Sequence, residues 1–435
     1  MKLIRILGII FCFINFQINI TSSEQYVLKN RALHTATLIG KKIYFLGGLT
    51  KSLTGPSTYS TNDFFTLDVS KWFNQSEGYP YEDLSNSTVN VIPVHNRATT
   101  SVGGHFKDSI FLFDGDMGRQ SNYASETLQS FSTSQQTWEN VEINFGEEPL
   151  RKTSMNAATD NNGKVYLFGG AKELTLNPIQ YFSNMDVFDT INKSWQSMNT
   201  PVTPRDGYTA TYIPESNIII YIGGFGKSNP YVTAGLIDMS NLDIYNTVNN
   251  SWGKLSTKDP PKSRVFHTAV LTNDHGRIIV FGGADYTTKN PAGTYYEVLD
   301  VNTYQWYHSY KDIDFGVPYK GHTATLVDDY MFIAFGFVYT EDGTILSDKI
   351  WTYKIGDYAD FELINRISEP STTVSPSLKP SSSTEPSTKP SSSDTKHIKT
   401  VVIAATISSS LVFVSIIIAA FVLYKRYKRR VLLIE

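Results

Sequence analysis

The feature that most constrains the fold of this chain is a short pattern that occurs six times at nearly even spacing. Each copy is an apolar run that ends in one or two glycines. The last glycine of each copy is Gly48, Gly115, Gly170, Gly224, Gly283 or Gly336, so the intervals are 67, 55, 54, 59 and 53 residues. A fixed period of this length indicates an array of similar structural units.

Two further residue types recur with the glycines. A basic residue followed by small or hydroxyl residues precedes each run, at Arg31, Arg97, Lys152, Arg205, Arg264 and Lys320. A tryptophan follows the run in the second to fifth copies, at Trp138, Trp195, Trp252 and Trp306. In the first copy we expect Tyr81 in this place rather than Trp72, and in the sixth Tyr358 or Phe361. Each unit therefore supplies four short strands: one after the basic residue, the apolar run, one after the polar loop that follows the glycines, such as MDVFDT or LDIYNT, and one that contains the tryptophan.

The residue types explain why such units would associate. A run that is apolar on both faces predicts a strand buried between neighbouring sheets. Glycine at its end allows a close approach by another segment, and one tryptophan buries about 150–250 Å² across the seam between sheets. Closing the sheets into a ring covers every apolar face and protects the sheet edges. We therefore predict an all-β fold, a six-bladed β-propeller.

These motifs resemble those of the kelch-repeat β-propeller family, over about residues 31–364. The matching glycines are Gly47, Gly48, Gly115, Gly169, Gly170, Gly223, Gly224, Gly282, Gly283 and Gly336. The second and sixth copies depart from the pattern, with Asp114 and Phe335 in place of the first glycine. The sequence FFTLDVSKWF from Phe64, together with the two ends of the chain, resembles fungal single-pass surface kelch proteins.

The resemblance also implies a possible activity, because kelch propellers include galactose oxidase. That family builds a copper-radical centre from a tyrosine crosslinked to a cysteine. The one cysteine here, Cys12, lies in a segment that we expect to be removed, so this centre cannot form. We expect no cofactor and no enzymatic activity.

The two ends of the chain predict a type I membrane protein. Residues 1–23 combine a basic start, an apolar stretch and small polar residues, as a secretory signal peptide does. Residues 400–424 form an uncharged apolar segment long enough to span a bilayer, and the basic tail 425–435 marks the cytoplasmic side. In the intervening stalk, residues 368–399, 15 of the 26 positions from Pro370 to Thr395 are Ser or Thr. We expect residues 24–367 to be the extracellular propeller.

Net charge argues against a nucleic-acid ligand. The whole chain carries −3, and residues 24–399 alone carry −9. Such a domain offers no basic surface for phosphates.

The histidines do not predict a metal site. His34, His267 and His322 recur in the repeated motif and are interpreted as packing and hydrogen-bonding residues. His95, His105, His275 and His308 lie at turns without the spacing of metal ligands. We find no catalytic or phosphate-binding motif and expect no metal.

Four glycosylation sequons and five long loops assign roles to the two faces. The sequons are Asn74, Asn86, Asn192 and Asn249. The last two precede a tryptophan by three residues, in the turn between the third and fourth strands, and we place Asn74 in the same turn. The loops after the glycines lie on the opposite face, called here the post-glycine face. Their aromatic residues are Tyr59, Tyr181, Phe182, Tyr231, Tyr286 and Tyr339, which either bind a partner or only seat their own loops.

Three functions remain after these arguments. The first is a noncatalytic cell-surface receptor or adhesin that binds a protein or glycan through the post-glycine face. The second is an extracellular enzyme of galactose-oxidase-like descent with a different or lost cofactor. The third is a structural wall-stress sensor.

Overall fold

The computed structural model describes residues 28–52, 57–71, 73–74, 78–85, 92–117, 128–172, 179–227, 234–313 and 316–367. The chain divides into two units, Met1–Ser371 and Thr372–Glu435, and all described residues belong to the first. The predicted signal peptide, Cys12, stalk, span and tail lie outside them. Within the described ranges, no helix has the length and apolar character needed to cross a membrane.

The described residues form an all-β fold, as predicted, in which each repeat supplies one four-stranded antiparallel sheet. The first sheet contains β1 (Thr35–Ile39), β2 (Lys42–Leu46), β5 (Phe64–Asp68) and β7 (Tyr81–Asp83). The second contains β8 (Thr99–Gly103), β9 (Ser109–Phe113), β10 (Leu128–Ser132) and β11 (Thr137–Asn140). The third contains β12 (Ala158–Thr159), β13 (Lys164–Phe168), β14 (Asn184–Asp189) and β15 (Ser194–Asn199).

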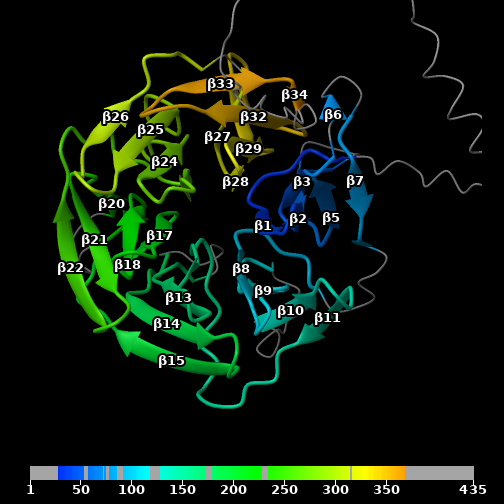
Figure 1. Cartoon of the computed structure of the whole chain (residues 1–435), viewed down its shortest axis with the longest axis vertical. Helices are drawn as coiled ribbons and strands as arrows, with labels where there is room; N and C mark the ends of the chain where they lie inside the picture. The colour runs from blue at the N-terminus through cyan, green and yellow to red at the C-terminus, as the bar shows by residue number, and fades with distance from the viewer. Residues whose placement is uncertain are drawn as a thin grey trace, which may run out of the picture. The chain divides into compact units, whose positions relative to one another are not determined.

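The second half of the unit repeats this arrangement. The fourth sheet contains β17 (Thr209–Ile213), β18 (Ile218–Ile222), β21 (Asn241–Asn246) and β22 (Ser251–Ser256). The fifth contains β23 (Thr268–Leu271), β24 (Arg277–Phe281), β25 (Tyr296–Asp300) and β26 (Trp306–His308). The sixth contains β28 (Thr323–Val327), β29 (Tyr330–Ala334), β32 (Ile350–Ile355) and β33 (Phe361–Ile364). Figure 1 shows the sheets around a common centre, with the first strand of each sheet innermost.

Three post-glycine loops form small hairpins of their own. These are β3 (Leu49–Lys51) with β4 (Thr58–Ser60), β19 (Phe225–Gly226) with β20 (Gly235–Leu236), and β30 (Phe337–Thr340) with β31 (Gly343–Leu346). The preceding links add β16 (Arg205–Asp206) to the second hairpin and β27 (Pro318–Lys320) to the third. Residues beyond the sixth sheet form β34 (Arg366–Ile367), which pairs with β6 (Phe73–Asn74).

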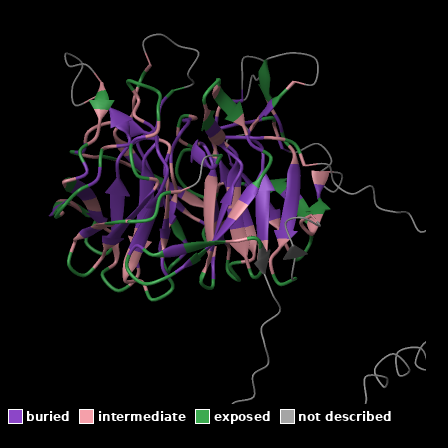
Figure 2. Ribbon diagram, turned by 90° about the horizontal axis from the view of Figure 1, so that it is seen from above, coloured by how far each residue is buried: buried purple, intermediate pink, exposed green. Residues whose placement is uncertain are grey.

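The cores between the sheets confirm the prediction from the apolar runs. Four of the five residues are buried in each second strand, which Figure 2 shows between two faces of exposed loops. Aromatic rings pack across the seams. The ring centres of Trp138 and Phe64 of the first sheet are 5.4 Å apart, and those of Trp252 and Phe168 of the third sheet are 5.1 Å apart. Burial across these seams therefore joins each sheet to its neighbours.

Tyr81 occupies the predicted tryptophan position in the first sheet, and in the sixth sheet the predicted Phe361 packs across the seam but from a different register position. Tyr81 pairs with Leu67 as Trp138 pairs with Phe131. In the sixth sheet the same register position belongs to Leu363, opposite Tyr353. Phe361 instead lies 4.7 Å from Tyr296 of the fifth sheet, so it packs across the seam from another register position.

The sheets are joined at the centre by a closed ring of backbone hydrogen bonds. In each link, one residue has a positive φ, and its N–H donates to the carbonyl of its counterpart in the preceding sheet. These residues are Leu33, Arg97, Ser154, Gly207, Phe266 and Gly321, with N···O distances of 2.7–3.3 Å. The ring closes where Leu33 donates to Gly321.

A second ring explains the final glycine of each repeat. Its N–H donates to a backbone carbonyl of the link to the next sheet, two residues before the positive-φ residue of that link. The first of these six bonds joins Gly48 to His95, and the last joins Gly336 to Arg31. A side chain would not fit there, because a Cβ on Gly48 would lie 2.8 Å from the Ala32 carbonyl. All four strands of the first and sixth sheets come from residues 35–83 and 323–364, so the described residues close the ring without exchanging a strand.

These rings correct the alignment of two repeats. The position of Arg31, two residues before the positive-φ residue, belongs to His95 in the second sheet and Tyr319 in the sixth. Arg97 and Lys320, which we had aligned there, were wrong by two residues and one residue. A basic residue near small residues was too short a pattern to fix the register, whereas the backbone rings fix it.

Candidate functional site

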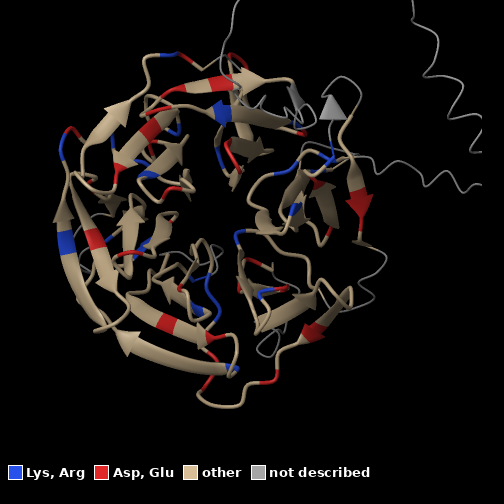
Figure 3. Ribbon diagram, in the orientation of Figure 1, with Lys and Arg blue, Asp and Glu red and all other residues tan. Residues whose placement is uncertain are grey.

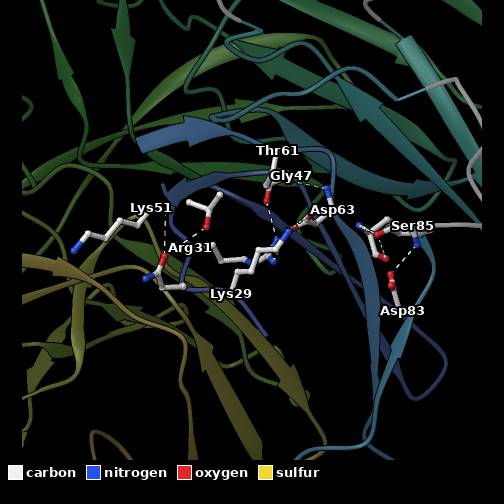
Figure 4. A network of polar contacts seen from close by, with 11 residues as sticks. Lys29, Arg31, Gly47, Lys51, Thr61, Asp63, Asp83 and Ser85 are labelled. Atoms are coloured by element: carbon white, nitrogen blue, oxygen red, sulfur yellow. Dashed lines mark hydrogen bonds and ion pairs between the residues drawn. The ribbon is translucent and has the colours of Figure 1, made fainter. Parts of the chain in front are cut away.

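In four sheets an ion pair joins the segment before the first strand to the third strand. The repeated basic residue pairs with an acidic residue at or next to the third strand: Arg31 with Asp63, Lys152 with Asp186, Arg205 with Asp243 and Arg264 with Glu297. Figure 4 shows Arg31, which donates to the Gly47 carbonyl at 3.1 Å and to Asp63 at 3.1 Å. These charges bind each other and the backbone, so they serve the scaffold rather than a ligand.

Hydrogen bonds between histidine and threonine side chains join part of the inner ring. His267 contacts Thr209 of the preceding sheet at 3.1 Å, His322 contacts Thr268 at 3.0 Å, and His34 contacts Thr323 at 2.9 Å. Burial lowers the pKa of His267 and of His322 to about 3, so both stay neutral near pH 7. The prediction that these three histidines are packing and hydrogen-bonding residues is confirmed.

An axial cavity of about 200 Å³ lies inside the ring of first strands. Threonines, alanines and the three histidines line most of it, and Arg97 is the one Lys, Arg, Asp or Glu among its described lining residues. Leu33, Ser154 and Phe266, which belong to the first backbone ring, also line it. The part of the cavity at this ring, next to the post-glycine loops, is called here the mouth.

Two carboxylates stabilise the charged form of the Arg97 guanidinium at the mouth. A terminal guanidinium nitrogen of Arg97 lies 3.8 Å from a carboxylate oxygen of Asp116, and Asp206 is its second acidic neighbour. Burial lowers the pKa of Arg97, and both carboxylates oppose that shift. Burial raises the pKa of Asp206 to about 7, although Arg97 counteracts it. Figure 3 shows both basic and acidic residues around the centre of the ring.

Three aromatic rings from neighbouring post-glycine loops, Tyr181, Phe225 and Tyr286, form what we call the mouth cluster. Phe225 and Tyr286 stack at 3.6 Å, and Tyr181 lies 6.4 Å from Phe225. Phe266 packs in the same apolar cluster and also lines the cavity, so the aromatic rings adjoin the mouth. Burial and the nearby Asp206 carboxylate raise the pKa of Tyr181.

The structure brings together only part of the predicted binding face. Tyr181 and Tyr286 meet in the mouth cluster, whereas Phe182 packs under the Lys152 ammonium at 5.3 Å. Tyr59 and Tyr339 remain exposed on the hairpins β3–β4 and β30–β31. Tyr231 lies outside the described residues.

The sequons lie where the strand order predicts, as far as the structure describes them. Asn192 and Asn249 are exposed in the turns β14–β15 and β21–β22. Asn74 lies in β6, within the connection from β5 to β7, and Asn86 is outside the described residues. Whether they carry glycans stays a prediction.

Sequence reasoning missed the acidic partners of the ion pairs and the pair Arg97 and Asp206. A signal for the first was present in three repeats, because the third strands of the third, fourth and fifth sheets contain an apolar–acidic–apolar triplet, as in Met185-Asp186-Val187 and Leu242-Asp243-Ile244. No comparable signal marks Asp206, whose role depends on the register of the rings. Among the residues that the structure describes, no three His, Cys, Asp or Glu side chains cluster as a metal site would require.

Comparisons with known proteins agree with the repeat. The attractin/LZTR1 beta-propeller family matches residues 9–291 and 81–350. Human kelch domain-containing protein 1 is 29% identical over 155 residues, 35% of this chain and 35% of that protein. A frog (Xenopus laevis) Rab9 effector protein with kelch motifs is 26% identical over 153 residues, 34% of this chain and 37% of that protein.

A bacterial relative covers more of the chain. N-acetylneuraminate epimerase 1 of Escherichia coli is 22% identical over 268 residues, 54% of this chain and 69% of that protein. The chain thus matches about a third of the length of the human and frog relatives, and none of these three matches tests the resemblance to fungal surface proteins. Because the family match extends over most of residues 9–350, the chain belongs to the attractin/LZTR1 beta-propeller family of kelch-repeat proteins.

Proposed function

We propose that this protein is a six-bladed kelch propeller, anchored outside the cell by one membrane span, that binds a protein or glycan without catalysis. The ligand-binding surface is the post-glycine face. The signal peptide, stalk and span of the sequence support this location, and the sequons at Asn192 and Asn249 support a glycan-covered opposite face.

The rigidity of the ring supports a binding role. Two closed rings of backbone hydrogen bonds hold the starts of the post-glycine loops in fixed places. Binding sites are often built on loops that a rigid scaffold positions, because less conformational entropy is then lost on association.

The observation that carries the proposal is the mouth cluster. Tyr181, Phe225 and Tyr286 come from three successive loops yet meet beside the axial cavity. Aromatic side chains are enriched at protein interfaces and also stack on sugars. The kelch relatives, one of them named as an effector of Rab9, support a protein as the ligand.

Site-specific photo-crosslinking on intact cells tests the proposal. A benzophenone amino acid replaces Tyr59 or Tyr339, which are 47% and 39% exposed on the post-glycine face. The matched control replaces Phe106, 81% exposed in the β8–β9 turn of the opposite face. We expect one crosslinked partner from positions 59 and 339 and none from 106. Equal crosslinking from both faces, or none from 59 and 339, would contradict the proposal.

An enzyme acting on a sugar is the second candidate. It is favoured by the match to N-acetylneuraminate epimerase 1, which covers 69% of that protein. Turnover of a sugar by the purified chain would support it over the binding role.

A further inference from the structure

The mouth of the axial cavity contains buried polar groups without a hydrogen-bond partner in the described part of the chain. They are the Ser154 hydroxyl and the Nε of Arg97, and both residues line the cavity. Ser154 is only 7% exposed, so water reaches it poorly. Native proteins satisfy nearly all buried polar groups, and an unsatisfied one costs about 1–3 kcal/mol. Four further atoms of the cavity lining also have no partner among the described residues: the Thr35 hydroxyl and the Nδ1 atoms of His34, His267 and His322. At the mouth, the Arg97 Nε–H is a donor and would need an acceptor, whereas the Ser154 hydroxyl can accept a hydrogen bond and so points to a ligand that carries a donor.

Asp206 gives the sign of charge that this ligand should carry. Asp206 is 5% exposed, and its own backbone N–H and Arg97 are the groups that oppose the rise in the pKa of its carboxyl caused by burial. Arg97 lies at ion-pair distance from Asp116, whereas no described cation lies that close to Asp206. A buried carboxylate without a paired cation is costly, and a bound cation would remove that cost.

The mouth cluster supplies the second feature of a cation site. The faces of aromatic rings attract ammonium and guanidinium groups. This already occurs within the chain, because the Lys289 ammonium lies 3.8 Å from the centre of the Tyr286 ring. Since Phe225 stacks on Tyr286 at 3.6 Å, both faces of Tyr286 are covered, and Tyr181 is the ring of the mouth cluster that can face a ligand. Tyr181 and Tyr286 adjoin the acidic group, since Asp206 pairs with Phe225 in the β16–β19 ladder, and Phe225 contacts both tyrosine rings. The Tyr181 ring and the carboxylate are therefore close enough to act on one ligand group.

We propose that the mouth binds a basic side chain, arginine or lysine, of the partner protein. Asp206 is the counter-ion, Tyr181 is the aromatic wall, and the Ser154 hydroxyl accepts a hydrogen bond from the entering group. This proposal rests on the protein-binding function and names the chemistry of the partner. Asp116 remains the partner of Arg97, whose guanidinium sets a limit on how deeply the basic group enters.

Three short peptides test the charge requirement on the full chain. They are acetyl-Gly-Arg-Gly-amide, its citrulline analogue with the same shape and no charge, and its glutamate analogue, each titrated by saturation-transfer NMR. We expect the arginine peptide to bind at least about tenfold more tightly than the citrulline peptide, as for loss of one charged hydrogen bond. Equal binding of these two, or tighter binding of the glutamate peptide, would overturn the proposal.

Two substitutions of opposite effect test the residues. Asp206→Asn should weaken arginine-peptide binding by about tenfold, and Arg97→Gln should strengthen it several-fold because a like charge is removed. The matched control is Asp342→Asn, which removes one charge from the exposed β30–β31 turn of the same face and should change nothing. Wild-type affinity in Asp206→Asn would overturn the proposal. If that variant is unstable, Tyr181→Ala serves instead, with the same expected loss.

The crosslinking experiment separates this proposal from the function on which it rests. If positions 59 and 339 still crosslink a partner while no arginine peptide binds, the basic side chain is wrong and the protein-binding role stands. If Asp206→Asn abolishes both the crosslink and peptide binding, the basic group belongs to the partner.

Discussion

The second and fifth sheets have the same strands and register but different side chains at the repeat positions. The fifth has Arg264 paired with Glu297, His267 bonded to Thr209, and the glycines Gly282 and Gly283. The second sheet has His95 in place of Arg264, Gln129 in place of Glu297, Ala98 in place of His267, Asp114 in place of Gly282, and Gly115 in place of Gly283. Of these, only the final glycine is common to both sheets.

The shared backbone explains why both sheets fit one ring. Gly115 donates to the Lys152 carbonyl at 2.9 Å, and Gly283 donates to that of Tyr319 at 2.5 Å. Both sheets also contribute to the first backbone ring, through Arg97 and Phe266. The ring therefore depends on main-chain bonds, while buried side chains can be exchanged provided that both members of a pair change together.

The largest expected effect comes from breaking the pair in the fifth sheet at one end. Arg264→Met leaves the buried Glu297 carboxylate with only Thr294 and His308 as partners, and we expect a loss of about 3 kcal/mol in the free energy of unfolding. Urea titration followed by tryptophan fluorescence measures it. The double variant Arg264→His with Glu297→Gln copies the second sheet and should lose less than half as much. A double variant that loses the full sum would show that the two sheets are not interchangeable.

A smaller effect should appear at acidic pH in the sheets that have the histidines. Because burial lowers the pKa of His267 and His322 to about 3, the unfolded chain binds protons that the folded chain does not. The neutral histidines therefore leave the free energy of unfolding unaffected above about pH 6.5. Below that pH it falls toward pH 3, and at pH 5 each histidine has lowered it by roughly 2 kcal/mol. His322→Gln retains a polar partner for Thr268 and should flatten the pH dependence by one histidine's share. The exposed His105→Gln is the control, and an equal flattening there would refute the assignment.

The same comparison shows how much of the molecule the sequence predicts. The apolar runs, the final glycines and the seam tryptophans depend on local residue type and period, so they predicted the strands, the cores and the all-β class. Arg97 and Lys320 were misaligned by two residues and one residue, because so small a shift of register changes nothing in composition, yet in the second sheet it decides that Arg97 lines the cavity. The mouth could not be predicted either, since Tyr181, Asp206 and Tyr286 are separated by 25 and 80 residues and meet only when the ring closes.

The smallest expected effect tests whether the second sheet departs from the fifth at some cost. Asp114 replaces the first glycine with φ 56°, and burial raises the pKa of its carboxyl well above the usual value. Asp114→Gly removes a left-handed non-glycine residue and a buried acid, so we expect a gain of about 1 kcal/mol in stability, measured by the same urea titration. The reverse change in the fifth sheet, Gly282→Asp, should destabilise, because its Cβ would lie 2.6 Å from the Tyr319 carbonyl. A loss of stability in Asp114→Gly would instead show that attraction between Asp114 and Lys152 of the third sheet outweighs the backbone strain.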